Sequence, residues 1–269
     1  MAGFEAAGEV VAVGEAVTGP RPGARVVGVG RGAFAEYMVL PAAAAISPPP
    51  GTTELQALGL VVNWPTALAA LKPLGGLRAG QTVLIHAAAG ATGQAAVTLA
   101  KHYGAVVIAT ASPGKHEQVL ALGADTVLDS TGGDLAATVL RLTGGTGVDL
   151  VLESAGGSTL EASLAAAKRV TGRVVVYGLA GGEATITNWD LVYRHQVHLI
   201  GLNLGVLIRS APQAFGDVMA ELMTLVATGV LAPGRPVAYE LADGPRALAE
   251  LEARTTTGKL ALLPSGVTG

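Results

Sequence analysis

The feature that most constrains the fold is an alternation of short β-branched runs with helix-like stretches, which begins near residue 81. The strand-like runs cover residues 82–86, 105–110, 126–128, 149–153, 173–177 and 197–202, and the helix-like stretches include 94–101, 115–122 and 160–168. Strands that alternate with helices in this way usually pair in parallel. The pattern therefore predicts an α/β fold, in which a doubly wound parallel sheet carries helices on both faces.

The two ends of the chain have a different pattern. In the first 65 residues, strand-like runs at 8–13, 25–29 and 35–40 are separated by Gly and Pro clusters, which indicates a small β-rich barrel. The tail combines helices at 215–228 and 245–253 with strands at 236–240 and 259–263, and we expect it to fray at 265–269. We expect residues 1–65 and 210–269 to form one domain and residues 66–209 the other.

Composition excludes several classes of protein. Half of the 269 residues are hydrophobic and only 14% are charged, which excludes a disordered chain. Cysteine is absent, so disulfides and thiolate sites are excluded. The net charge is −3 without a long basic run, which argues against nucleic acid as a partner. The longest stretch without Asp, Glu, Lys or Arg, 79–100, is interrupted by polar residues, and the N-terminus does not resemble a signal peptide. We therefore expect a cytoplasmic protein without a membrane span.

A glycine-containing turn joins the first predicted strand of the sheet to the following helix, within residues 83–96. In a dinucleotide fold, one glycine of this turn lets the backbone approach the pyrophosphate and a later one permits close packing of helix and strand. Gly90 and Gly93 match these two roles, whereas Ala88 stands in place of the first glycine of G-x-G-x-x-G. The alternative is a turn with a purely structural role.

The end of the second strand indicates which dinucleotide would bind. An NAD-selective site usually places an Asp or Glu there, but this chain has Ser112 and Lys115, which favour the 2′-phosphate of NADP(H). Ser112 could equally be a helix N-cap followed by Pro113. Lys115 would oppose the helix dipole at a cost of about 0.3–1 kcal/mol, which a bound phosphate would explain.

The glycine-rich stretch 177–182 follows the fifth strand of the predicted sheet. Ligands of such sheets bind beyond the carboxyl ends of the strands, so we expect this stretch to line the cofactor cleft. It could also be an ordinary glycine-rich connection.

Together these motifs resemble the medium-chain dehydrogenase/reductases, in their zinc-independent quinone oxidoreductase branch. The resemblance spans nearly the whole chain, and the family turn A-x-x-G-x-x-G is satisfied by Ala87, Gly90 and Gly93. The other motifs are GFEAAGEVVAVG at 3–14, GAFAEY at 32–37, LGAD at 122–125, GVDLVLESAGG at 147–157 and TGKL at 257–260. The run ATASPGK at 109–115 also resembles the enoyl reductase modules of polyketide synthases.

The resemblance implies a Rossmann domain beside a GroES-like catalytic domain, a homodimer joined along the sheet edge, and NADPH-dependent reduction of quinones or α,β-unsaturated carbonyls. The substrate would be a small, largely apolar molecule. No catalytic residue is assigned. By motif position, the cofactor would be held by Ala89, Gly90, Ala91, Thr92 and Gly93 at the pyrophosphate, Ser112 and Lys115 at the 2′-phosphate, Tyr177, Gly178 and Leu179 at the centre, and Thr66 and Asn203 near the nicotinamide.

The chain departs from the family pattern in three places. It enters the pattern only near Gly3, so we expect an N-terminally incomplete catalytic domain that lacks the asparagine and tyrosine relatives place near the substrate. Asp129 and Ser130 stand where relatives often have a tyrosine near the 2′-phosphate, and the carboxylate would weaken phosphate binding. A Trp-Pro-Thr stretch at 64–66 replaces the usual Gly-Leu-Thr.

Other chemistries have weaker support. His195 and His198 have the spacing of a metal pair but lack an evident third ligand, so we expect no metal site. The sequence contains no G-x-S-x-G motif, which argues against a hydrolase. We interpret Phe34, Trp64 and Trp189 as packing residues, Tyr37 more as a packing residue than as a proton donor, and His86, His102 and His116 as structural positions at a strand end, a helix surface and a helix start.

Four functions remain open at this stage. The leading one is a reductase of a quinone or enone, and the second is an enoyl-thioester reductase of a biosynthetic pathway. A repurposed relative could instead catalyse a non-redox step such as cyclisation, or could bind NADP(H) without turnover. Oxidation of the cofactor by an acceptor would separate the first two from the others.

Overall fold

A computed structural model describes residues 2–266 of the chain. The chain divides into two compact units, one made of Met1–Pro65 with Met219–Gly269 and the other of Thr66–Val218. The predicted frayed end at 265–269 falls largely on residues 267–269, which lie outside the described residues.

The unit Thr66–Val218 contains a six-stranded sheet in which all neighbouring strands run parallel. Its order is β5-β4-β3-β6-β7-β8, so the direction of winding reverses between β3 and β6. This topology confirms the predicted doubly wound α/β fold. The strands are β3 (Thr82–Ile85), β4 (Val106–Ala111), β5 (Thr126–Asp129), β6 (Leu150–Glu153), β7 (Arg173–Val176) and β8 (His198–Gly201).

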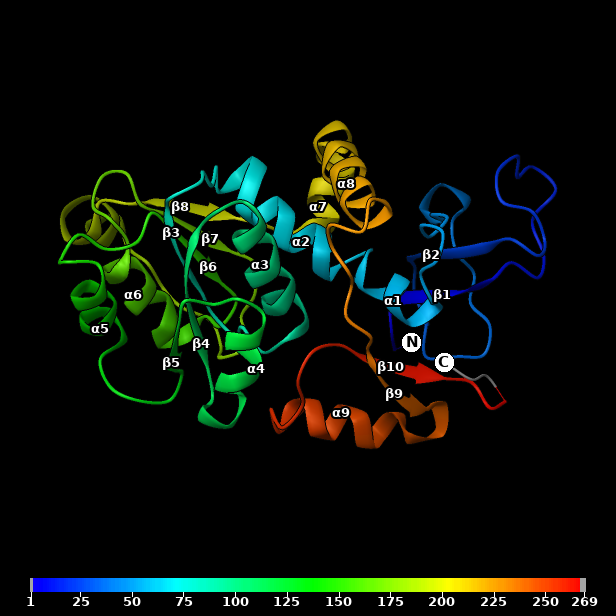
Figure 1. Ribbon diagram of the computed structural model, residues 1–269. Helices are drawn as coiled ribbons and strands as arrows, with labels where there is room; N and C mark the ends of the chain where they lie inside the picture. Colours follow the sequence, from blue (N-terminus) through cyan, green and yellow to red (C-terminus); the bar gives the residue numbers. More distant parts are fainter. Residues whose placement is uncertain (1, 267–269) are drawn as a thin grey trace. The chain divides into compact units, whose positions relative to one another are not determined.

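Helices lie on both sides of this sheet (Figure 1). On one side, α5 (Leu135–Leu142) and α6 (Gly157–Ala166) pack against a core that includes Leu84, Val151 and Val174. Full burial of each such side chain contributes about 1.5–3 kcal/mol. The other side carries α3 (Ala91–His102) and α4 (His116–Ala121), and the unit also contains the π-helices η2 (Ala70–Leu74) and η4 (Asp190–His195), the 3-10 helix η3 (Pro113–Lys115) and α7 (Leu204–Ser210).

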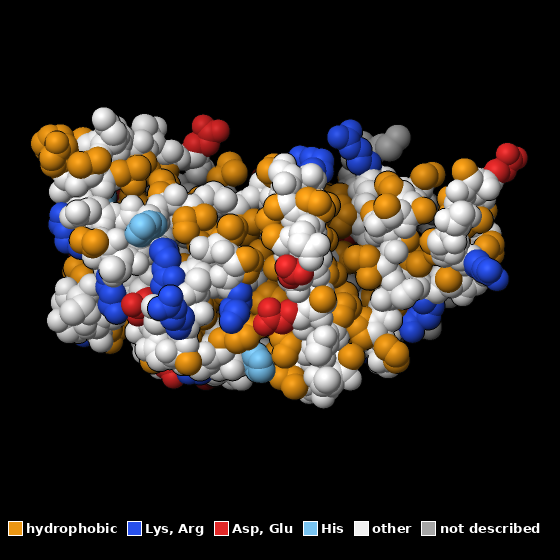
Figure 2. Space-filling model, turned by 90° about the horizontal axis from the view of Figure 1, so that it is seen from above, with side chains coloured by type: hydrophobic (Ala, Val, Ile, Leu, Met, Phe, Trp, Pro, Cys, Tyr) orange, Lys and Arg blue, Asp and Glu red, His pale blue; other side chains and the backbone are white. Residues whose placement is uncertain are grey.

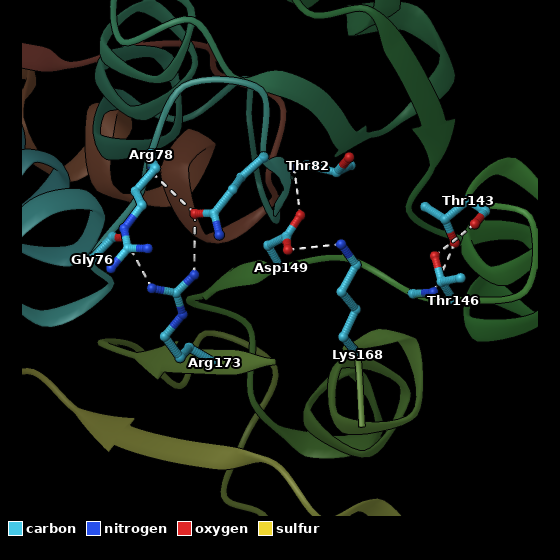
Figure 3. A network of polar contacts seen from close by, with 10 residues as sticks. Gly76, Arg78, Thr82, Thr143, Thr146, Asp149, Lys168 and Arg173 are labelled. Carbon is cyan, nitrogen blue, oxygen red and sulfur yellow. Dashed lines mark hydrogen bonds and ion pairs between the residues drawn. The ribbon is translucent and has the colours of Figure 1, made fainter. Parts of the chain in front are cut away.

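A polar network joins the amino ends of the central strands (Figure 3). The Asp149 carboxylate accepts a 2.9 Å hydrogen bond from the backbone N–H of Thr82 and lies 2.7 Å from the Lys168 ammonium. The Arg173 guanidinium donates to the carbonyl oxygen of Gly76 at 2.9 Å and to the Gln81 side chain at 3.2 Å. These contacts fix β3, β6 and β7 relative to one another at that edge of the sheet.

The other unit contains two small sheets. Antiparallel β1 (Glu5–Glu9) pairs with β2 (Arg25–Val29), and parallel β9 (Val237–Glu240) pairs with β10 (Leu260–Leu263). The Lys259 ammonium joins the tail to the head, because it lies 2.7 Å from the Glu5 carboxylate and 2.9 Å from the Asn63 amide oxygen. The helices are η1 (Ala42–Ala44), α1 (Glu54–Gly59), η5 (Leu241–Asp243) and α9 (Gly244–Glu252), while α2 (Asn63–Ala69) and α8 (Pro212–Ala227) cross the division between the units.

Four expectations about the elements and their packing were wrong. The strand expected at 8–13 is β1 at Glu5–Glu9, so residues 10–13 lie outside it. Residues 35–40 form no strand, because their backbone pairs with no neighbouring strand among the described residues. Tyr37 is accordingly 72% exposed and does not pack in a core. Trp189 is 62% exposed and stacks on Tyr193 at the surface, with ring centroids 4.5 Å apart. Trp64 is buried, as expected.

The helical segment Glu54–Leu74 is long and apolar enough to cross a membrane by length and composition alone. In the structure, however, 67% of its most apolar window is buried inside the protein. Leu55, Leu60, Leu68 and Leu71 are among the most completely buried side chains of the molecule. These are the properties of a core helix.

Charged side chains are sparse on the face of the molecule seen in Figure 2. Hydrophobic side chains are interspersed with single or small groups of Lys and Arg, as the low charged fraction of 14% predicts.

Candidate functional site

The structure brings most of the predicted site residues to one edge of the sheet. The carboxyl ends of parallel strands lie at the same edge, and the predicted residues directly follow four of these strands. They are Ala89 to Gly93 after β3, Ser112 and Lys115 after β4, Tyr177 to Leu179 after β7 and Asn203 after β8. Thr66 is different, because it lies within α2 with a buried side chain and not in a loop that follows a strand.

The turn after β3 is tight and strained. Ala87 has a φ of 48°, in the left-handed region that residues other than glycine rarely adopt. The N–H of Gly90 donates to the carbonyl oxygen of Ala87 at 2.9 Å and closes the turn, and the N–H of Ala88 donates to Thr110 at 2.9 Å. A Cβ atom on Gly93 would collide with the carbonyl oxygen of Ala87. Position 93 therefore accepts only glycine, because helix and turn approach so closely there.

This turn leads into the N-terminus of α3. Gly90 is the N-cap residue and supplies no side-chain hydrogen bond. The first N–H groups of a helix have no intrahelical acceptor, and together with the helix dipole they favour a bound anion. The geometry fits the pyrophosphate of a dinucleotide.

The ends of β4 and β5 lie side by side, since Ala111 pairs with Asp129. Ser112 occupies the N-cap position of η3, but its side chain makes no capping hydrogen bond. Lys115 precedes the first residue of α4. The Asp129 carboxylate accepts hydrogen bonds from the Thr131 N–H at 2.8 Å and hydroxyl at 2.7 Å, and these bonds lower its pKa. An ionised carboxylate therefore stands beside the strand that leads to Ser112 and Lys115.

The loops after β6 and β7 are joined backbone to backbone. The N–H of Gly157 donates to Gly182 at 3.0 Å, and the N–H of Ala180 donates to Ser154 at 3.3 Å. A Cβ on Gly178 would lie 2.6 Å from the carbonyl oxygen of Ser154, and one on Gly156 would collide with the carbonyl oxygen of Gly182. The glycines of this region are therefore required by the close approach of two loops, and not only by a flexible connection.

Three predicted residues in these loops have different surroundings. The Tyr177 hydroxyl is buried and has no hydrogen-bond partner of standard geometry among the described residues, and burial raises its pKa. Leu179 is 64% exposed at the surface of its loop. The amide oxygen of Asn203 caps α7 by accepting a 3.0 Å hydrogen bond from the N–H of Val206.

Sequence reasoning missed one buried acid and underestimated one histidine at this edge. Glu153 ends β6 with no exposed surface, and its carboxylate accepts hydrogen bonds from the N–H groups of Ala155 at 2.6 Å and Gly156 at 3.2 Å. Burial raises the pKa of Glu153. His86 directly follows β3 and is 2% exposed. Their position in the sequence was the available signal, because each is an ionisable residue that directly follows three apolar residues, 83–85 for His86 and 150–152 for Glu153.

A cavity of about 340 Å³ lies beside the N-terminus of α6. Its lining includes His195, Arg194, Glu161 and Asp190. Arg194 lies 2.8 Å from Glu161 and 3.7 Å from Asp190, so its charge is already compensated. Over residues 2–266, no three His, Cys, Asp or Glu side chains gather in a way that could hold a metal ion.

Comparisons with known proteins agree with this architecture. Residues 1–50 match the family described as alcohol dehydrogenase GroES-like domain, and residues 91–224 match the one described as zinc-binding dehydrogenase. The latter name refers to zinc, but the absence of cysteine and of a clustered ligand set means that the described residues do not fit a zinc site.

One curated relative is the spectinabilin polyketide synthase system protein NorB of Streptomyces orinoci, which is 37% identical over 97% of this chain. The chain spans only 12% of that protein, and 3% of the erythronolide synthase EryA2 of Saccharopolyspora erythraea, which it also matches.

Two solved structures resemble the chain over most of their length. A mycobacterial protein complexed with NADPH is 34% identical, with a TM-score of 0.91 over 97% of this chain and 82% of that one. Escherichia coli quinone oxidoreductase complexed with NADPH is 30% identical, with a TM-score of 0.90 and the same coverage. On this likeness and the fold described above, the chain belongs to the medium-chain dehydrogenase/reductase superfamily, in its quinone-oxidoreductase-like branch.

Proposed function

We propose that this protein is an NADPH-dependent reductase of a quinone or another α,β-unsaturated carbonyl compound. The observation that carries the proposal is the turn from Ala87 to Gly93. Its backbone lies close to the first turn of α3, and no side chain caps the N-terminus of that helix. The family membership of the chain also supports the proposal, because two similar structures were solved with NADPH.

Different groups of residues at the carboxyl edge would each bind a different part of the cofactor. Ala89, Gly90, Ala91, Thr92 and Gly93 would hold the pyrophosphate through backbone N–H groups and the helix dipole. Ser112 and Lys115 would hold the 2′-phosphate. Tyr177, Gly178 and Leu179 would lie along its centre, with Thr66 and Asn203 toward the nicotinamide. When bound, NADPH supplies the hydride, while these residues orient it.

The likeness to polyketide synthases supports an enoyl thioester as a second acceptor class within the same chemistry. Quinones, enones and enoyl thioesters all present an electron-poor carbon to a hydride, so the same cofactor geometry serves each. A homodimer is a further part of the proposal. The edge strand β8 is mostly exposed, and Val192 and Tyr193 of the preceding π-helix are 57% and 65% exposed.

The test is binding of NADPH and NADH by fluorescence, followed by cofactor oxidation after adding a simple quinone, an enone and an enoyl thioester in turn. We expect selective binding of NADPH and turnover with at least one acceptor. Lys115→Ala should weaken NADPH about tenfold or more and leave NADH unchanged, since a charge-assisted hydrogen bond contributes about 1.5–3 kcal/mol. Lys115→Arg, which keeps the charge, is the matched control.

Binding of neither cofactor would overturn the proposal. Binding without oxidation by any acceptor would support a non-redox relative instead, and formation of a product without cofactor consumption would identify a step such as cyclisation.

A further inference from the structure

We propose that His86 is a positioning residue, which holds the strained turn after β3 in the shape that receives the dinucleotide. The inference concerns the geometry of the turn, and it rests on the proposed function only for the identity of the ligand. His86 is the last residue before Ala87, whose φ of 48° sets the course of the turn.

Both ring nitrogens of His86 are engaged by neighbouring elements. Nδ1 lies 3.1 Å from the hydroxyl of Thr110 in β4, and Nε2 lies 2.9 Å from the hydroxyl of Ser163 in α6. All three side chains are at most 2% exposed. The imidazole therefore joins the end of β3 to β4 and α6 in a region buried from solvent.

The direction of the hydrogen bonds assigns the tautomer. The Ser163 hydroxyl donates its proton to the carbonyl oxygen of Thr159 at 2.8 Å, so it accepts from the Nε2–H of His86. Nδ1 then carries no proton and accepts from the Thr110 hydroxyl. A neutral histidine satisfies every donor and acceptor in this chain of bonds.

Thr110 forms hydrogen bonds with the residues on both sides of the strained Ala87. Its hydroxyl binds the side chain of His86, and its carbonyl oxygen accepts a 2.9 Å hydrogen bond from the N–H of Ala88. Ala87 lies between these two attachments. A left-handed alanine persists only where its surroundings fix it, and the two bonds to Thr110 provide this restraint.

A residue that only filled the core here would be apolar. Leu84, two positions earlier and within β3, shows this, because it packs in the core with Val151 and Leu164. The imidazole instead occupies the position next to the turn, where it can restrain a backbone conformation through directional bonds.

The experiment uses Thr110→Val and Ser163→Ala, each of which removes one hydrogen bond to His86 and keeps the histidine. Leu164→Ala is the control, because it opens the core next to Ser163 and keeps both hydrogen bonds of the imidazole. Three quantities are measured on each protein: amide hydrogen exchange of residues 87–93 without cofactor, the Kd for NADPH, and Tm. We expect faster exchange in the turn and a Kd raised about fivefold in both hydrogen-bond variants, but only a lower Tm in the control.

The outcomes separate the two proposals. If the hydrogen-bond variants lower Tm but leave turn exchange and Kd as in the control, His86 is only structural and this inference is overturned. If the unmodified protein binds no NADPH, the proposed function fails, while the exchange measurement still tests the restraint on the turn. A Leu164→Ala protein that loosens the turn equally would also overturn the inference.

Discussion

The carboxylate of Glu153 lies 2.6 Å from the backbone N–H of Ala155, two residues further along the chain. It also accepts the N–H of Gly156, so a single buried side chain satisfies two donors where β6 turns toward α6. The same loop is joined to the loop after β7, and Glu153 therefore supports both.

Two replacements of Glu153 should distinguish the effect of its hydrogen bonds on stability from the effect of its charge. Glu153→Gln keeps an acceptor oxygen for the two N–H groups and removes a charge whose burial is unfavourable, so stability at pH 7 should be unchanged or higher. Glu153→Ala leaves both donors buried and unsatisfied, which costs about 1–3 kcal/mol for each group. Denaturant unfolding of the two variants measures the difference. Equal losses in both would contradict this account.

Stability should fall on mild acidification because of His86. Burial lowers the pKa of His86 from 6.5 to about 4. Between these values the unfolded chain binds a proton that the folded protein does not, so this contribution is complete above pH 6.5 and is lost as the pH falls toward 4. The loss would reach about 3 kcal/mol.

Glu153 opposes this trend, because burial raises its pKa and the folded protein then takes up a proton more readily than the unfolded chain. Its contribution is present at low pH and is lost as the pH rises through its raised pKa. Unfolding measured from pH 7.5 to 4.5 should therefore show a steeper loss in Glu153→Gln than in the unmodified protein. A flat profile in that variant would contradict the assignment to His86.

Gly93→Ala should disrupt the turn after β3. Its Cβ would overlap the carbonyl oxygen of Ala87, and relief of such overpacking typically costs about 1–3 kcal/mol. We expect a lower Tm and weaker NADPH binding. Gly19→Ala is the control, because a Cβ at position 19 meets nothing within 4 Å and Gly19 lies outside the candidate site. Similar behaviour of the two variants would exclude close packing as the reason for a glycine at 93.

Leu199→Lys should dissociate the proposed homodimer. Leu199 lies on the edge strand β8 and is 37% exposed, so the lysine would be tolerated in a monomer but not at a buried interface. Light scattering after size exclusion measures the mass. Leu142→Lys on α5, at 44% exposure, is the control and should keep the mass of the unmodified protein. A monomeric unmodified protein would end the proposal of a dimer.

The parallel sheet could be predicted from sequence because apolar runs such as 150–152 and 174–176 leave little alternative to a doubly wound fold. The helix starts were predicted about three residues late at α3 and α6. The first turns of these helices, beginning at Ala91 and Gly157, are made of Gly, Ser, Thr and Ala and lack apolar periodicity.

The candidate site was predictable to the extent that it depends on local chain geometry. The turn at Gly90 and Gly93 carries its own signature, whereas the bonds of His86 join residues 24 and 77 positions away. No local pattern records such partners. The predicted strand at 35–40 failed for the related reason that β-pairing depends on a partner strand, which the sequence of one segment does not contain.

The charged network at the amino ends of β3, β6 and β7 stabilises the fold at the opposite end of the strands from the loops that would bind the ligand. A four-residue strand spans about 13 Å, and substitutions more than about 7–10 Å apart usually have additive effects. The sequences of loops such as 112–115 and 177–182 can therefore change, or be exchanged between homologues, without loss of stability. Asp149, Lys168 and Arg173 stabilise the sheet independently of these loops. Selection for a new coenzyme or acceptor would therefore change residues at the carboxyl ends of these strands and leave their amino ends nearly unchanged.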